Sequence, residues 1–318
     1  MPFLKNIGDN MVYLKKRKAM GILAVAGASL LFGTNYSMGR AVQMAGMSET
    51  CNGLWTALMA IGCNLLYCRV KKRRFFARIT RAQLLLCILC GAVSVWLSGY
   101  MFQIAYRYLT VSETTMLHFL HPSLIAVFMA VVFKEHFSFA KAAAIAFSVG
   151  GMAFISGGAA SGAALGIAAA VLSGVFYAVY AILLEKSSLR DVEGTTVVLY
   201  MNIASALSAL CVSLACGKFS LPVSSVVWMC DAMMAVSSFF AYLLTCYAIH
   251  ALGATLASFG GMLEPIASCL LSAVIYRESM SMNVLYGSVL TVASVVLCSM
   301  GGMPRARKCS GFPHKGPE

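Results

Sequence analysis

The sequence predicts an all-α integral membrane bundle of ten transmembrane helices, built from two inverted five-helix repeats. Hydrophobic residues make up 60% of the chain and charged residues 11%, whereas an ordinary soluble domain is about 25% charged. The apolar residues fall in runs close to the ~20 residues that cross about 30 Å of hydrocarbon. In addition, two Pro–Glu pairs recur at a fixed distance along the chain.

Basic residues and glycines bound the expected spans of the first half. Lys15–Lys18 precede the first span, Arg69–Arg81 separate the second from the third, and Lys134 follows the fourth. The first span is too long for a signal peptide, and a similar segment recurs after residue 163, so we expect it to stay uncleaved. The five spans are residues 19–39, 51–69, 83–105, 113–133 and 139–157.

Five comparable runs follow in the second half. The run at 195–215, like that at 139–157, has indistinct ends, so a total of nine or eleven spans stays open. The expected spans are residues 164–184, 195–215, 226–249, 254–275 and 283–301.

The repeat is marked by Pro122 with Glu135 and by Pro265 with Glu278. Each proline precedes its glutamate by 13 positions, and 143 positions separate the two pairs. A duplicated membrane bundle is typical of transporters whose site lies between the halves. Five spans per half is an odd number, so the second half must insert upside down. We therefore divide the chain into five parts. They are a cytoplasmic basic N-terminal segment (residues 1–18), a first repeat (19–157), a short linker (158–163), a second repeat (164–301) and a cytoplasmic tail (302–318).

The net charge of +13 is explained by topology rather than by nucleic-acid binding. Of the 24 basic residues, all but Arg40, Arg107, Lys218 and Arg277 fall on the side of the N-terminus. The positive-inside rule then places both termini in the cytoplasm. We expect a multi-pass protein of the plasma or inner membrane, with no nucleic-acid partner.

The cysteines and short motifs indicate no metal, cofactor or catalytic residue. Cys87 and Cys90 form a CxxC pair, but it lies within an apolar helix, without a second pair or a histidine at zinc spacing. The other ten of the 12 cysteines are mostly scattered through the expected spans, where cysteine packs as a small apolar residue. No GxxxxGK[ST] loop occurs, so direct use of ATP is not expected.

Short motifs around the two prolines carry a family resemblance. The second half has Ala248, Leu252, Ala254, Ala257, Glu264-Pro265 and Arg277-Glu278-Ser279; the first has Leu109, His121-Pro122 and Lys134-Glu135-His136. With its five-plus-five spans, the chain resembles the EamA-type members of the drug/metabolite transporter superfamily. His121 stands where that family often has the glutamate of its Glu-Pro pair. The resemblance implies efflux of amino acids or related metabolites, through a cavity lined by the first, third, fourth, sixth, eighth and ninth helices.

Polar stripes on three of those spans are candidates for the cavity wall. At 100° per residue, each set lies along one face of its helix. The stripes are Trp96, Tyr100, Gln103 and Arg107 on the third span, Ser173, Tyr177 and Tyr180 on the sixth, and Asp231, Ser238, Tyr242 and Thr245 on the eighth. Asp231 and Arg107 lie near span ends and are expected at the mouth or surface. Interfacial anchoring and helix–helix hydrogen bonding are the alternative roles.

The ionisable groups within spans are the strongest candidates for binding or coupling. Glu264 precedes Pro265, whose missing N–H frees a backbone carbonyl, so a cation or a proton could be held there. His118 and His121 share a face of the fourth span with Glu113, and histidine titrates near neutral pH. The alternative for each is a neutral histidine satisfied by a neighbouring hydroxyl or carbonyl. Asn35, Tyr36 and Asn202 are weaker candidates. Pro122, Glu135, Pro265 and Glu278 are expected to be structural.

The leading hypothesis is a secondary transporter that moves a small organic solute by alternating access. The solute is expected to be an amino acid or related metabolite, or a drug-like compound, with a proton as the candidate coupling ion and the lipid bilayer as the other partner. A lipid flippase or a non-transporting membrane scaffold is the alternative, and an intramembrane enzyme is a remote one. The oligomeric state stays open.

Overall fold

A computed structural model describes residues 2–73, 77–134, 138–157, 163–222, 224–261, 263–277 and 282–301. Over these residues, all regular secondary structure is helical. Seven helical segments are long and apolar enough to cross a membrane: Lys16–Met44, Glu49–Val70, Arg81–Ala105, Val111–Val132, Ala164–Lys186, Gly194–Ala215 and Ser225–Leu252. Shorter apolar helices occur at Phe139–Gly151 and Leu285–Ser294. The chain is thus a multi-pass, all-helical membrane bundle, while the count of ten spans stays a prediction.

In the first half, α1 is the longest helix and includes most of the basic N-terminal segment. The third expected span is one continuous rod, made of α3, a π-helical stretch η1 and α4. The elements are α1 (Pro2–Met44), α2 (Glu49–Val70), α3 (Arg81–Leu89), η1 (Cys90–Leu97), α4 (Ser98–Ala105), α5 (Val111–His118), α6 (His121–Val132) and α7 (Phe139–Gly157).

The second half repeats this order with one additional short turn. A 3-10 turn, η2, links its first two helices. The elements are α8 (Ala164–Lys186), η2 (Ser188–Asp191), α9 (Gly194–Ala215), α10 (Ser225–Leu252), α11 (Ala254–Gly260), α12 (Leu263–Tyr276) and α13 (Met282–Gly301).

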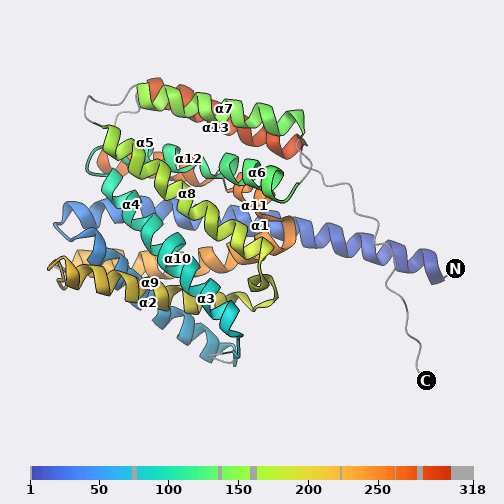
Figure 1. Cartoon of the computed structure of the whole chain (residues 1–318), viewed down its shortest axis with the longest axis horizontal. Coiled ribbons are helices and arrows are strands. Elements are labelled where there is room, and N and C mark those ends of the chain that lie inside the picture. Colours follow the sequence, from blue (N-terminus) through green and yellow to red (C-terminus); the bar gives the residue numbers. More distant parts are fainter. Residues whose placement is uncertain are drawn as a thin grey trace.

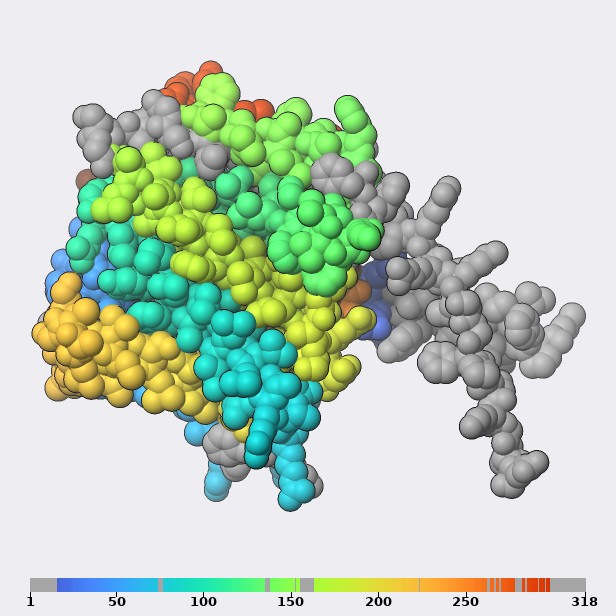
Figure 2. Space-filling view, viewed as in Figure 1, coloured from blue at the N-terminus to red at the C-terminus, as the bar shows by residue number. Residues whose placement is uncertain are grey.

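Helices from the two halves pack against each other throughout the bundle. Figure 1 shows α7 and α13 side by side along one edge, with α2 and α9 at the opposite edge. Between these edges, α1 packs against α10 and α12, while α8 packs against η1, α4, α5 and α6. On the face drawn in Figure 2, the α3–α4 rod and α8 run side by side. Large apolar side chains such as Leu85, Leu172 and Leu207 are exposed on these helices, as a lipid-facing surface requires.

Both spans that contain the repeated prolines are broken at the same place. The fourth span breaks between α5 and α6, and Pro122 lies in the first turn of α6. The ninth breaks between α11 and α12, and Pro265 is the third residue of α12. Proline is tolerated there because the N–H groups of a first helical turn have no partner within the helix.

The ends of the two broken spans also match. Lys134 and Arg277, 143 positions apart, both have a left-handed backbone, with φ of 51° and 53°. Such values are uncommon outside glycine. Glu135 and Glu278 follow directly and lie outside the described residues, as do most of the linker and the tail from residue 302. The structural role expected of both glutamates stays a prediction.

Candidate functional site

A cavity of about 190 Å³ lies in the middle of the bundle. It gathers side chains that are far apart in the sequence, from both halves of the chain. Of the 11 residues singled out from the sequence as binding or coupling candidates, it is lined by nine: Asn35, Trp96, Tyr100, Gln103, His118, Tyr177, Ser238, Tyr242 and Glu264. Three of the four stripe residues predicted on the third span and two of the four on the eighth thus face one common space, whereas Arg107, Asp231 and Thr245 do not line it.

A second, smaller cavity of about 30 Å³ lies on the other side of Glu264. It has room for about one water molecule and contains His121. The two cavities share Phe32, Tyr177 and Glu264 as lining residues. The larger extends toward Glu49 at the start of α2, and the smaller toward Ala254 at the start of α11. Glu264 therefore stands between two spaces that lead in opposite directions.

The Glu264 carboxylate is 7% exposed and accepts a hydrogen bond from the Tyr36 hydroxyl through Oε1. Tyr36 is itself held by stacking on Phe102, with ring centroids 4.5 Å apart and ring planes 13° from parallel. Because α12 begins just before Glu264, the carboxylate also lies in a first helical turn, where the helix dipole favours negative charge.

His118 and His121 join the break in the fourth span to α8. His118 Nδ1 is 2.7 Å from the Ser173 hydroxyl, which donates its own proton to the Ala170 carbonyl. His118 Nδ1–H must therefore be the donor in its bond. His121 Nδ1 donates in turn to the His118 carbonyl, at 3.1 Å.

The Tyr177 ring fixes the two imidazoles from α8, with its centroid 5.6 Å from that of His118 and 4.6 Å from that of His121. Both histidines are buried, and both use Nδ1 for a structural hydrogen bond, so only Nε2 is left for a ligand or a proton.

A hydrogen-bonded group joins α1 to α10 on the cavity wall. Asn35 Nδ2 donates to the Ser238 hydroxyl at 2.8 Å, and the Ser237 hydroxyl donates to Asn35 Oδ1. Tyr242 packs edge-on against Phe32, with ring centroids 5.0 Å apart. These contacts fix the orientation of the polar stripe on α10.

Tyr180 is the predicted site residue that lines neither of these cavities. It is 1% exposed and lies in the apolar core, where its hydroxyl is 3.4 Å from Cys246 Sγ. Its ring packs against those of Tyr177 and Tyr242, both at a centroid distance of 5.7 Å. The structure therefore gives Tyr180 a position behind the cavity wall.

Two helices that were not expected at the cavity contribute to it. From α2 come Glu49, Asn52 and Thr56, and from α9 come Asn202 and Ser205. The polar positions on α2 recur at spacings of three and four residues, the period of one helix face. That spacing could have identified α2 from the sequence, where only Asn202 of this set was noted.

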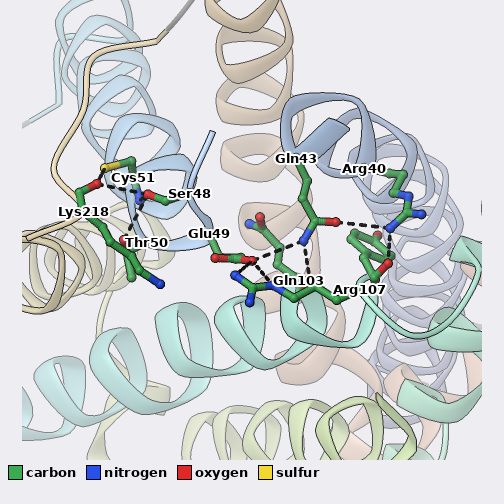
Figure 3. Close-up of polar contacts among 10 residues, drawn as sticks. Arg40, Gln43, Ser48, Glu49, Thr50, Cys51, Gln103, Arg107 and Lys218 are labelled. Carbon is green, nitrogen blue, oxygen red and sulfur yellow. Dashed lines mark hydrogen bonds and ion pairs between the residues drawn. The ribbon is translucent and has the colours of Figure 1, made fainter. Parts of the chain in front are cut away.

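A polar network lies at the Glu49 end of the larger cavity (Figure 3). Glu49, 5% exposed, accepts from Arg107 Nε at 2.6 Å, and Arg107 is about half exposed. Gln43 Nε2 donates to the Gln103 carbonyl at 3.0 Å and lies 3.3 Å from Glu49 Oε1. Arg40 donates to Gln43 Oε1 and to the Tyr106 carbonyl. The network ties α1, α2 and the end of α4 together.

The structure also places two further ionisable residues, Glu113 and Asp231. Glu113 completes a capping box with Thr110: the Thr110 N–H donates to Glu113 Oε2 at 2.9 Å, and the Glu113 N–H donates to Thr110 Oγ1 at 3.2 Å. Asp231, expected at the mouth or surface, is 0% exposed, so that expectation is wrong. It lies on α10, which packs against both α1 and α2.

The described residues contain no group of three His, Cys, Asp or Glu side chains that could hold a metal ion. Cys87 and Cys90 are buried free thiols in the apolar core.

Comparison with known proteins agrees with this architecture. The model of the EamA-like transporter family matches the chain twice, over residues 19–157 and 164–300. A solved structure described as "Crystal structure of protein" is 17% identical, with a TM-score of 0.63 over 90% of this chain and 98% of that chain, a likeness of fold alone. No curated protein matches the chain significantly. The two family matches confirm the resemblance: the chain belongs to the EamA-like transporter family and is a multi-pass membrane transporter of the drug/metabolite transporter type.

Proposed function

We propose that this transporter exports a small organic solute bearing a cationic amino group, such as an amino acid or a related metabolite, by proton-coupled alternating access. The observation that carries the proposal is the position of Glu264, a buried carboxylate shared by the two cavities. Neither lysine nor arginine is among the described residues that line them.

An ionised carboxylate at membrane depth costs at least about 2.5 kcal/mol unless a positive charge compensates it. The protein supplies Glu264 with a hydroxyl from Tyr36 but with no cationic side chain on the cavity walls. The compensating charge must therefore come from outside, either as the amino group of a solute or as a proton. Competition of these two for one carboxylate is a direct way to couple solute export to proton entry.

The remaining cavity wall suits an organic cation with polar substituents. Tyr36, Phe102 and Tyr177 present aromatic rings near Glu264, and ring faces attract cations. Asn35, Asn52 and other amides and hydroxyls can bind the polar groups of a solute. A wall without arginine disfavours highly phosphorylated substrates, and its polar groups favour a water-soluble solute over a lipid.

Pairwise contacts support an inverted arrangement of the two five-helix halves. The packing of α1 on α10 has its counterpart in that of α8 on the η1–α4 rod, and α2–α9 and α7–α13 pair equivalent helices. A Cβ atom on Gly21 would meet Leu252 at 2.9 Å, and one on Gly166 would meet Leu109 at 3.1 Å. The two leucines are 143 positions apart, the distance of the repeat, and the two glycines each lie near the start of the first span of their half.

In an inverted repeat, each half can adopt the conformation that the other half now has. The larger cavity would then close and the smaller one would open on the opposite side. The space on the Glu49 side of Glu264 is the larger one in this conformation, and the opposite space is the smaller. The reverse conformation would enlarge the space toward α11. The distribution of basic residues assigns the α11 side to the cytoplasm.

The test is transport in liposomes with purified protein, using a panel of amino acids, amines, sugars, nucleosides and drugs, with and without a proton gradient. Substitution E264Q removes the charge with little change of shape and is expected to abolish transport while the protein stays folded. E193Q is the matched control, because Glu193 lies on the surface in an exposed ion pair with Arg73. Unchanged solute flux in E264Q would overturn the proposal.

A further inference from the structure

Asp231 is a second buried carboxylate on the helix face that lines the cavity. It lies on α10, one turn before Met234, which lines the larger cavity. At 100° per residue, its direction differs from those of Ser238 and Tyr242 by only about 20°. Its exposure is 0%, and within the described part of the chain neither carboxyl oxygen has a hydrogen-bond partner. Glu264, by contrast, is satisfied by Tyr36.

The wall between Asp231 and the cavity is formed by α2. Thr56 faces the Asp231 carboxyl group, without the geometry of a hydrogen bond. The Thr56 hydroxyl lies 3.4 Å from Asn52 Oδ1, and Asn52 Nδ2 has no partner among the described residues. Both Thr56 and Asn52 line the larger cavity. Two polar side chains of α2 that line the cavity, Asn52 and Thr56, therefore connect it to Asp231.

The charged groups on helices around Asp231 are engaged elsewhere or point to solvent. Arg40 on α1 donates to Gln43 and to the Tyr106 carbonyl, and Glu49 on α2 is paired with Arg107. The side chain of Lys218 is exposed, while its carbonyl accepts from Ser48 and Cys51 (Figure 3).

The remaining packed elements offer no cation either. The sequences of α9 and α11 contain no charged residue and no histidine, and the charged residues of α8, Glu185 and Lys186, lie at its far end. The neighbouring residue Cys230 on α10 is a thiol, and it shares one apolar cluster with Cys51 on α2.

A carboxylate without a cationic partner or hydrogen bonds is costly in such a place, whereas the neutral acid is much less so. We propose that Asp231 is a second proton-binding site of the transporter, separate from Glu264. It takes a proton from the outer aqueous phase through the cavity, past Asn52 and Thr56, and holds it as a neutral carboxylic acid. The carboxylate re-forms when that proton is released in the other conformation. The role of Asp231 in transport rests on the proposed function, whereas the protonation of Asp231 does not.

The first test measures protonation without any solute. Infrared spectra of purified protein in lipid nanodiscs at neutral pH should contain a carbonyl stretching band of a protonated carboxyl group that is lost in D231N. D191N is the matched control, because Asp191 lies exposed in η2, and its spectrum should retain the band. An identical carboxyl band in wild type and D231N would overturn the inference, whatever the outcome for transport.

The second test separates coupling from solute movement. In liposomes, D231N should retain solute exchange in the absence of a pH gradient and lose accumulation driven by that gradient, while D231E should recover the accumulation. Proton-driven accumulation that persists in D231N, or accumulation driven by a sodium gradient instead, would overturn the inference. If wild-type protein moves no solute at all, the proposed function fails, and the infrared result still decides the state of Asp231.

Discussion

The hydroxyl of Tyr36 on α1 donates a hydrogen bond to Glu264 on α12, across 228 positions of sequence. The bond joins the first helix of one family match to the broken ninth span of the other. Among the described residues, Tyr36 alone hydrogen-bonds to the Glu264 side chain, and both residues line the larger cavity. A solute that binds Glu264 must therefore share the carboxylate with Tyr36.

Substitution Y36F should weaken solute binding while leaving the protein folded. A hydrogen bond to a charged group contributes about 1.5–3 kcal/mol, and 1.4 kcal/mol corresponds to about a tenfold change in affinity. We expect the KM for the transported solute to rise at least about tenfold, measured as initial flux against concentration in liposomes. Y286F is the control, because Tyr286 is exposed on α13 and outside the described cavities. Equal KM values for wild type and Y36F would contradict the assigned role.

Glu113 should prove structural in spite of its place beside two cavity histidines. Its capping box with Thr110 needs an acceptor at this position, which glutamine also supplies. We expect E113Q to transport normally and E113A to lose about 0.5–1.5 kcal/mol of stability, the usual net contribution of the hydrogen bond to the Thr110 N–H that it removes. Thermal unfolding in detergent and flux in liposomes check both. Loss of flux in a well-folded E113Q protein would assign Glu113 to the transport chemistry instead.

Gly174 on α8 should not tolerate alanine. An added Cβ would collide with the His118 carbonyl oxygen, which is backbone and also accepts the hydrogen bond from His121. We expect G174A to yield little monodisperse protein in size-exclusion chromatography. The matched control is G62A on α2, where an added Cβ meets nothing within 4 Å and alanine should favour the helix by up to about 1 kcal/mol. Normal yield of G174A would show that α8 can shift away from His118.

Much of the membrane fold could be predicted from the sequence, because the bilayer imposes long apolar runs and satisfied backbones. The breaks before Pro122 and Pro265 follow from the chemistry of proline. The repeated Pro–Glu spacing indicated the duplication, and the five-plus-five spans with the short motifs around the prolines indicated the family that the two matches confirm. The count of ten spans and the inversion remain predictions. The expected fifth, ninth and tenth spans are not among the seven described segments that are long and apolar enough to cross a membrane.

The candidate site was predictable only as a set of helix faces. Helical periodicity found Trp96, Tyr100 and Ser238, since residues three or four apart share a face. Periodicity within one helix does not indicate which other helix it meets. The pairing of Tyr36 with Glu264, the contribution of α2, and the burial of Asp231 all depend on tertiary packing.

The Glu49–Arg107 ion pair should contribute more to stability than the Arg73–Glu193 pair. Glu49 is 5% exposed, whereas both partners of the second pair are 47% exposed. Exposed pairs contribute about 0.2–1 kcal/mol, because water screens them. A double-mutant cycle with E49Q and R107M, read out by reversible unfolding, should give a coupling energy above about 1 kcal/mol, and one with E193Q and R73M a smaller value. The reverse order would show that burial of Glu49 does not strengthen its ion pair.

The orientation of the bundle can be tested with two engineered cysteines in a background without the exposed Cys211 and Cys216. Lys218, after α9, and Arg73, after α2, lie on opposite sides of the proposed topology, and both side chains are exposed. Because the side of Arg73 has the excess of basic residues, we expect that side to be cytoplasmic. A membrane-impermeant maleimide added to intact cells should therefore label K218C and leave R73C unlabelled, until detergent opens the membrane. Labelling of R73C alone in intact cells would reverse the orientation, and with it the assignment of the larger cavity to the outer side.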